Sequence, residues 1–577
     1  MNRFDDFKLP LCDAILEKFN FFELYPFDGG GYFINQEFAR SYDDKEIAEN
    51  VLAGVLSDFG PLEKLDHSKF ERWRSVEKSA WLNRLYFLVP LSKYYRLTNQ
   101  KKIADLVKAI VLNFIRNNPA PKTEAEIGAN YNHVMHIRDN EYNVSTAEQL
   151  ATSETDIKYV WFDFQVASRI IHLLYSLHFI KGAGVFNEEE YSEVENSIIE
   201  HARIIAICES KFQKLATGNH QSLRGLALLY AACFSSGTEE GGLFLEEGLR
   251  ICKFHIENDY FPDGVLKEIS PSYHAFETWH HRDSYLLGQI YGFEVSPRHE
   301  AVLAAAAGFL SAMQTPDGNS LVINDGYSLN LKPLQASFPK KLLASTPQKD
   351  IFYKGANLAF YRDDDFYFCL DASTNMGKFS HFHAGKNAVT IFCHGQPFLV
   401  DSNCCSYDDP KFAFYKDAQR HSTLLVDGVG ESVFYGIYDC PFSPTVKIDA
   451  WQDDKIVSAL TSQVEQWKSV IWTRTVKIGA GCIQITDEIC NSHHAGKNYS
   501  FLFNLHPQVE VKKLKDKEFF LKMNGTILLV KFEGDGKVEV ATGLCFHHFR
   551  HQPNQQLVFS TETAHQKYSL KTSFIAE

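Results

Sequence analysis

The chain has 577 residues, which is too long for a single hydrophobic core, so we expect at least two domains. Its composition, with 45% apolar and 23% charged residues, is typical of a soluble globular protein. A net charge of −14 argues against a broad surface for nucleic acid or for an anionic membrane, and we expect neither as a partner.

The cysteines and the N-terminus bear on the compartment. The twelve cysteines are scattered without a Cys-x-x-Cys pair, which argues against a zinc ribbon or a redox motif. Reduced, mostly buried thiols are expected, and these are typical of a reducing compartment. Residues 1–6 carry early acids and no apolar core follows, so we expect no secretory signal and no membrane span. The sequence therefore predicts a cytoplasmic protein; a periplasmic or secreted location requires a leader that has been removed.

The first part of the chain has a helical period. From about residue 46 to 340, apolar residues recur at spacings of three and four, as in amphipathic helices. Clear examples are 47–59, 81–95, 103–115, 159–180, 223–233, 243–256 and 301–313. Many helices of similar length without a strict repeat predict a toroid or solenoid rather than a bundle. Residues 1–45, rich in Phe and Gly, are expected to form an irregular N-terminal cap.

The pattern changes after about residue 341. Short alternating runs typical of strands occur at 366–370, 388–392, 422–426, 469–472 and 526–530. Asp-Gly and Asn-Gly turns lie among them, as at 427–428 and 524–525. An antiparallel β-sandwich over residues 341–577 explains this pattern most economically, so the fold class is multidomain α+β.

Two segments of the helical part carry candidate functional groups. Asn219 and His220 stand at the predicted start of a helix, where Asn219 could cap the helix or its amide could bind an anion. Tyr273 and His274 follow a turn that contains proline, and they bring a phenol and an imidazole. Taken alone, simple packing is the more economical interpretation of this second pair.

Two arginines, Arg84 and Arg169, lie near tryptophans on predicted helices. They could clamp a carboxylate beside an aromatic sugar platform, or they could belong to the core and the surface. The residues alone leave both interpretations open.

Three histidines and an aspartate stand out in the β part. Alternate side chains of a strand share one face, so His381 and His383 can point the same way from one strand. Asp401 ends the apolar run 397–400, and His421 follows at the turn 420–423. Such a set can bind a divalent metal and leave one imidazole for proton transfer. The alternative is that these are four ordinary polar residues in a chain with 23 histidines.

The order of these groups carries a resemblance to a known family. Asn-His, then Glu-x-Ser-x-x-Tyr-His, His-x-His, Asp and Arg-His-Ser-Thr resembles the heparinase II/III superfamily of polysaccharide lyases, over about residues 75–500. The resemblance implies an (α/α) toroid followed by an antiparallel β-sandwich, with the active site between them. It also implies β-elimination on an acidic, uronate-containing polysaccharide, above all a glycosaminoglycan of the hyaluronan, chondroitin or heparan type.

The resemblance also implies catalytic roles at individual positions. Asn219, with His220 beside it, would neutralise the uronate carboxylate. Tyr273 would be the catalytic phenol, and His381 would act as base for the alternative substrate epimer or support the carboxylate. No organic cofactor is needed for this chemistry.

Metal and substrate sites follow from the same resemblance. His383, Asp401 and His421 would hold a divalent metal, with zinc expected ahead of Mn or Ca, in a structural rather than a catalytic role. Six further residues are candidates for binding substrate: Arg84, Arg169, His274, Tyr407, Tyr415 and Arg420.

Two positions depart from the family pattern. Gly385 stands where relatives often carry Asp in His-x-His-x-Asp, and Ser422 stands where many carry Asn. The first departure removes a carboxylate that would support the metal ligands. Neither position is itself a proposed ligand or proton-transfer group.

Other functions remain as alternatives. A glycoside hydrolase needs two opposed carboxylates, and no spacing marks such a pair among the 72 acidic residues. A uronate C5-epimerase would share the proton abstraction, and a catalytically silent glycan-binding protein could share the scaffold. A metal-dependent hydrolase would need an open coordination position at the metal. The sequence does not predict the oligomeric state.

Overall fold

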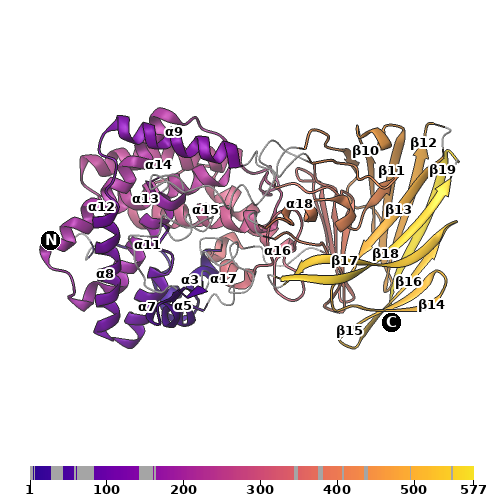
Figure 1. Cartoon of the computed structure of the whole chain (residues 1–577), viewed down its shortest axis with the longest axis horizontal. Coiled ribbons are helices and arrows are strands. Elements are labelled where there is room, and N and C mark those ends of the chain that lie inside the picture. Colours follow the sequence, from indigo (N-terminus) through magenta and orange to yellow (C-terminus); the bar gives the residue numbers. More distant parts are fainter. Residues whose placement is uncertain are drawn as a thin grey trace.

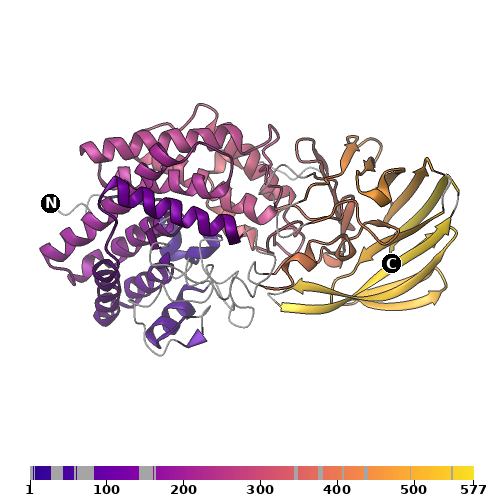
Figure 2. The ribbon, with the colours of Figure 1, turned by 45° about the horizontal axis from the view of Figure 1, so that its top comes forward.

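The computed structural model describes residues 4, 7–26, 43–56, 60–61, 83–141, 160–161, 164–343, 349–374, 381–405, 409–434, 440–493, 496–547, 550–563 and 565–577. Helices occupy one end of the elongated molecule and strands occupy the other (Figure 1). The second view keeps the two parts apart, with the N-terminus at the helical end and the C-terminus among the strands (Figure 2). The architecture is the expected (α/α) toroid followed by an antiparallel β-sandwich, so the predicted fold class is confirmed.

The helical part contains most of the helices. Their bounds are α2 Cys12–Glu17, α3 Phe21–Leu24, α5 Asp44–Leu52, α7 Leu88–Thr98, α8 Lys101–Asn117, α9 Glu124–Glu141, α11 Phe164–Ile180, α12 Glu188–Ile207, α13 Asn219–Phe234, α14 Glu239–Asn258, α15 Pro271–Tyr291, α16 His299–Ala312 and α17 Leu331–Ala336. A short helix, α18 Phe412–Tyr415, lies within the β part. In the described part of the chain, no helix combines the length and the apolar character that crossing a membrane requires.

The N-terminal segment is tied into the toroid. Residues 1–45 were expected to be irregular, but their described part contains α2, α3 and the start of α5. The buried Asp44 carboxylate accepts from the backbone N–H of Phe21 and from Lys93 Nζ, the latter at 2.7 Å. Phe4 and Phe21 are buried in the same hydrophobic core as the toroid helices.

Among the described residues, three antiparallel sheets form the β part. The five-stranded sheet has the order β3 Asp350–Tyr353, β4 Leu358–Arg362, β5 Phe366–Asp371, β6 Ala388–Cys393 and β7 Gln396–Leu399. The eight-stranded sheet has the order β14 Glu510–Lys515, β15 Glu518–Met523, β16 Thr526–Glu533, β19 Lys567–Ala576, β12 Cys482–Asn491, β11 Val470–Gly479, β10 Lys455–Thr461 and β9 Thr445–Ile448. The four-stranded sheet has the order β17 Lys537–His547, β18 Arg550–Thr563, β13 Lys497–Asn504 and β8 Leu424–Val426. A small pair, β1 Val55–Leu56 and β2 Gly60–Pro61, belongs to the helical part.

The five-stranded sheet joins the two parts because its two faces bury different cores. On β5, Tyr367 and Cys369 pack with the core of the helical part, whereas Phe368 and Leu370 pack with the core of the sandwich. Adjacent side chains of a strand point to opposite faces, so every residue of β5 is buried. The loops that leave this sheet therefore lie against the toroid, where they can share a site with its helices. The predicted domain boundary at residue 340 stays a prediction.

Candidate functional site

Asn219 begins α13 and faces a carboxylate from the same half of the chain. Gly218 precedes it with φ +138°, a conformation that glycine adopts without strain. The Asn219 side chain does not cap the helix. Instead, its Nδ2 donates to both oxygens of Glu268, at 3.2 and 3.0 Å, and its backbone N–H also donates to Glu268. The amide is thus held at the N-terminus of a helix, where anions are stabilised.

Tyr273 lies in the first turn of α15. Ser270 caps this helix by accepting the Tyr273 N–H, and Pro271 occupies the first turn, where its missing N–H costs nothing. The phenol ring stacks on the imidazole of His381, with centroids 3.6 Å apart and ring planes 18° apart. This contact brings the toroid and the β part together at one point.

His381 is held between two carboxylates. Its Nδ1 lies 3.0 Å from Asp325 Oδ2, and its Nε2 lies 3.1 Å from Glu268 Oε2. Burial alone would lower the pKa of His381, but the hydrogen bonds to Asp325 and Glu268 outweigh it and raise that pKa. We call Asn219, Glu268, Tyr273 and His381 the cross-domain cluster. In it an amide and an imidazole both bond the Glu268 carboxylate, and a phenol stacks on the imidazole.

The segment 381–383 is not a strand, contrary to the expectation from alternation. Its two imidazoles nevertheless meet the same residue, because His383 Nε2 lies 2.7 Å from the other oxygen of Asp325. Lys416 Nζ lies 3.3 Å from both Asp325 oxygens. Burial would raise the pKa of Asp325, but Lys416 and the two histidines hold it well below its usual range. Burial lowers the pKa of His383 to about 4, so this ring is neutral at neutral pH.

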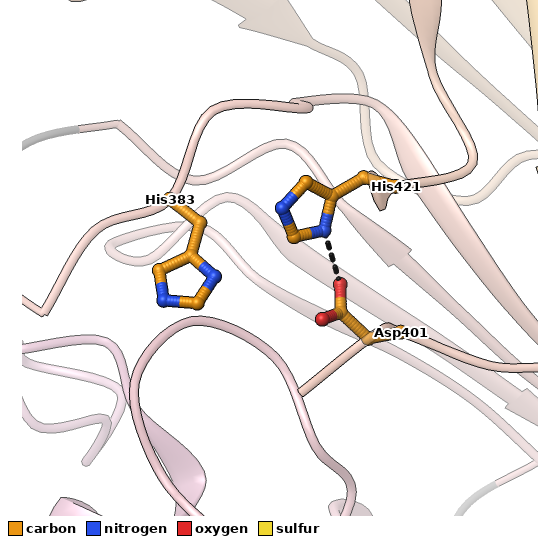
Figure 3. A group of neighbouring side chains, drawn as sticks. All are labelled: His383, Asp401 and His421. Atoms are coloured by element: carbon orange, nitrogen blue, oxygen red, sulfur yellow. Dashed lines mark hydrogen bonds and ion pairs between the residues drawn. The ribbon is translucent and has the colours of Figure 1, made fainter. Parts of the chain in front are cut away.

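His383, Asp401 and His421 form a second group, which we call the His-Asp-His cluster. One potential ligand atom from each lies within 4.8 Å of the others (Figure 3). His421 Nδ1 lies 2.7 Å from Asp401 Oδ2, the contact that Figure 3 marks. His383 Nδ1 and His421 Nε2 are buried and have no hydrogen-bond partner among the described residues. Two imidazole nitrogens and a carboxylate are a donor set that suits zinc, so the residues present fit a divalent metal.

The glycine at position 385 has a steric explanation. Gly385 has φ +101°, and a Cβ built there would lie 2.5 Å from the Cβ of His421. An aspartate at this position would therefore strain the backbone and collide with a candidate ligand. The buried carboxylate nearby comes from Glu431, which accepts the backbone N–H groups of Gly385 and Lys386 at 2.7 and 3.0 Å.

Three of the expected substrate-binding residues have polar atoms that are engaged inside the protein. The Arg169 guanidinium is fully buried, donating to His201 Nε2 at 2.7 Å and to the carbonyls of Asn83 and Val160. His274 uses both ring nitrogens on the backbone, accepting from the N–H of Leu266 at 3.2 Å and bonding the carbonyl of Ala306 at 3.0 Å. The buried Tyr415 hydroxyl lies 2.6 Å from His551 Nδ1. Their polar atoms are already used inside the protein, which favours structural roles, and substrate contact by these three stays a prediction.

The other residues expected at the site differ from one another in burial and contacts. Arg84 is buried, and its carbonyl oxygen lies 2.8 Å from His172 Nδ1. The half-buried Arg420 guanidinium lies over the ring of Phe414, 4.1 Å from its centroid. His220 is half-buried beside Asn219, and Tyr407 lies outside the described residues. Their roles in binding stay predictions.

Sequence reasoning assigned no role to three residues that the structure brings to the site. Glu268 belongs to the Glu-x-Ser-x-x-Tyr-His pattern, and its position five residues before Tyr273 was the available signal. Asp325 lies in an Asn-Asp-Gly turn, and Lys416 follows a short helix; neither stands out from its neighbours. Asp325 contacts His381 and Lys416 across more than fifty residues of chain, so no local pattern could reveal Asp325 or Lys416.

Comparison with known proteins covers nearly the whole chain. A family model described as the heparinase II/III N-terminus matches residues 48–353, and one described as heparinase II/III-like, C-terminal, matches residues 346–573. A curated heparin-sulfate lyase of Bacteroides stercoris is 20% identical over 349 residues, which is 56% of this chain. The chain spans about half the length of that relative, 49%.

Solved structures with the same fold are distant in sequence. A crystal structure of heparinase III superposes with a TM-score of 0.72 at 15% identity, over 98% of this chain and 89% of the other. A heparan sulfate lyase from Pedobacter heparinus gives a TM-score of 0.62 at 15% identity, over 98% and 88%. A chondroitin lyase that is a baculovirus envelope protein gives 0.51 at 10% identity, over 98% and 84%. At such identities these likenesses establish the fold.

Proposed function

The chain belongs to the heparinase II/III family, and on that premise we propose that it is a lyase that cleaves a uronate-containing glycosaminoglycan by β-elimination. The observation that carries the proposal is the cross-domain cluster, in which Asn219 and His381 both bond Glu268 and Tyr273 stacks on His381. The relatives titled heparin-sulfate lyase, heparan sulfate lyase and chondroitin lyase support a glycosaminoglycan as the substrate class.

The proposed chemistry begins with the uronate carboxylate. The C5 proton of a uronate is weakly acidic because the adjacent carboxylate opposes further negative charge. Hydrogen bonds or positive charge on that carboxylate lower the barrier to an enolate-like intermediate. The Asn219 amide supplies hydrogen bonds, and His381, whose pKa the neighbouring carboxylates raise, supplies a hydrogen bond and favours positive charge. Glu268 takes these donors in the structure, so a substrate carboxylate must share them or displace the Glu268 side chain.

Tyr273 is the proton-transfer group of the proposal. Its phenol lies against His381, so it is next to the donors that would hold the carboxylate. In the elimination the C5–H and C4–O bonds break, and a C4–C5 double bond forms. The deprotonated Tyr273 oxygen takes the proton from C5, and the phenol so formed gives that proton to the departing C4 oxygen, so the proton balance closes on one residue. In this assignment His381, engaged at both nitrogens, supports the carboxylate rather than removing the proton.

The His-Asp-His cluster would hold a divalent ion, with zinc as the proposed metal. When bound, the ion would supply structural bracing beneath the site. His383, Asp401 and His421 all come from the β part, whereas Asn219 and Tyr273 come from the toroid. The residues' own contribution is to order the loops that carry His381.

The test is an ultraviolet assay for unsaturated uronate with heparan sulfate, chondroitin, hyaluronan and alginate. The proposal expects absorbance to rise with at least one glycosaminoglycan, and Asn219→Ala to lower kcat/KM by about 10²–10³-fold. A uronate C5-epimerase would incorporate solvent deuterium without cleaving the chain. A silent glycan-binding protein would give neither signal. Absence of absorbance with every glycan in the panel would reject the lyase.

A further inference from the structure

One buried carboxylate connects the two clusters. Asp325 is 1% exposed, and its two oxygens bond two different imidazoles. Oδ2 lies 3.0 Å from His381 Nδ1, and Oδ1 lies 2.7 Å from His383 Nε2. A carboxylate only accepts when ionised, so each histidine directs an N–H toward Asp325. The hydrogen bond at one nitrogen then decides what the other nitrogen offers.

The opposite nitrogens face different partners. His381 Nε2 faces Glu268 in the cross-domain cluster. His383 Nδ1 belongs to a ring of the His-Asp-His cluster, is buried, and has no hydrogen-bond partner among the described residues. Because Nε2 donates to Asp325, Nδ1 is the nitrogen of His383 that is left to ligate a metal.

The turn that carries Asp325 is fixed on several sides. Asn324 has φ +60°, and its Oδ1 accepts the backbone N–H of His383 at 3.0 Å. Its Nδ2 donates to the carbonyl of Ile269 at 2.7 Å, just before the helix that bears Tyr273. The Asp325 N–H donates to the carbonyl of His381 at 2.9 Å. These bonds tie the turn to both the toroid and the segment 381–383, so the carboxylate has little freedom to follow either ring.

We propose that Asp325 is a positioning residue that sets the ring orientation of His381 in the cross-domain cluster and of His383 in the His-Asp-His cluster. Loss of this carboxylate then disturbs catalysis and metal binding together, although Asp325 itself touches neither substrate nor metal. The expected effect on catalysis rests on the lyase function proposed above. The expected effects on the ring orientations and on metal binding do not.

Asp325→Asn is the informative substitution. Asparagine has nearly the same shape but one acceptor oxygen, so only one imidazole keeps its acceptor and the other faces an N–H. The expected result is a fall in kcat of about 10- to 100-fold with KM nearly unchanged, and a loss of zinc affinity in the range of about 10- to 100-fold. In the crystal structure of the variant, at least one of the two rings should be rotated from its wild-type orientation.

Asp371→Asn is the matched control. Asp371 is also a buried carboxylate at this junction, but it pairs with Lys386 at 2.8 Å and with Ser373. The Asp371→Asn variant should lose about as much thermal stability as Asp325→Asn, but its kcat and zinc affinity should change much less. If Asp325→Asn leaves both rings in place and matches the control in kcat and zinc affinity, the inference is wrong.

A measurement on the wild-type protein covers the case in which the variant does not fold. Neutron diffraction should find protons on His381 Nδ1 and His383 Nε2. A proton on His383 Nδ1 and none on its Nε2 would overturn the inference. If the wild-type protein lacks lyase activity but shows these protons and the zinc effect, the proposed function fails while Asp325 remains the positioning residue.

Discussion

His381 and His383 are two residues apart and share the Asp325 carboxylate, yet their surroundings are opposite. His381 has a second carboxylate, Glu268, and its hydrogen bonds to the two acids outweigh burial and raise its pKa. His383 bonds Asp325, and burial, together with the nearby charge of Lys416, lowers its pKa to about 4. The first ring is therefore suited to hold an anion, and the second to ligate a cation.

Tyr273 and His274 are likewise close in the sequence but have different surroundings. Tyr273 is half-buried and meets His381 across the junction of the two domains. His274 points into the toroid, where both of its nitrogens contact the backbone. In each of the two pairs, one residue belongs to the cross-domain cluster. Its near neighbour makes its contacts elsewhere, His383 in the His-Asp-His cluster and His274 inside the toroid. Residue type alone therefore does not identify a catalytic group; the partners of its polar atoms do.

Tyr273→Phe is expected to have the largest effect. The change removes the proton-transfer oxygen and keeps the ring that stacks on His381, so lyase activity should fall by about 10²–10⁴-fold with little loss of stability. Initial rates in the ultraviolet assay and a thermal melt measure the two quantities. Tyr291→Phe, at the other end of α15, removes a hydroxyl that bonds the backbone of Lys8, and this variant serves as the control. Equal activity of both variants would remove Tyr273 from the mechanism.

His383→Ala and His381→Ala separate the two histidines. Removing a ligand of the His-Asp-His cluster should abolish bound zinc, measured by elemental analysis. It should also cost roughly 3 kcal/mol of unfolding free energy when free zinc is about 100-fold above its Kd. His381→Ala should keep the metal and lose activity instead. If His381→Ala releases the metal as completely as His383→Ala, the division between the clusters is wrong.

Some features of the fold and of the site could be predicted from the sequence, and others could not. Helical and alternating periods predicted a helical part and a β part because they depend on local spacing, and the family resemblance predicted that Asn219, Tyr273 and His381 lie close together, without Glu268. Burial of Arg169 could not be predicted, because its partners lie in separate segments of the toroid. Nor could the role of Asp325, whose histidine partners are more than fifty residues away. Contacts of this kind depend on tertiary packing and leave no periodic signal.

The buried His274 should make the stability of the folded protein depend on pH. Burial lowers its pKa from 6.5 to about 4, so between these values the unfolded chain binds a proton that the folded chain does not. The stability from this group is complete above pH 6.5 and decreases as the pH falls toward 4, by roughly 2 to 3 kcal/mol. His274→Gln should make this decrease shallower in denaturant unfolding, and substitution of the exposed His394 should not. An unchanged slope in His274→Gln would contradict a neutral, buried imidazole.

Tyr415→Phe should have the smallest effect and tests whether this residue is structural. Its hydroxyl bonds His551 Nδ1, while His551 Nε2 bonds Asp409 at 2.8 Å, so the tyrosine completes a chain of hydrogen bonds. Loss of one hydrogen bond that leaves the rings in place costs about 1 kcal/mol of unfolding free energy. KM for the glycan should not change, because the hydroxyl is buried and already bonded. A raised KM with unchanged stability would instead return Tyr415 to the substrate site and show that His551 releases it when glycan binds.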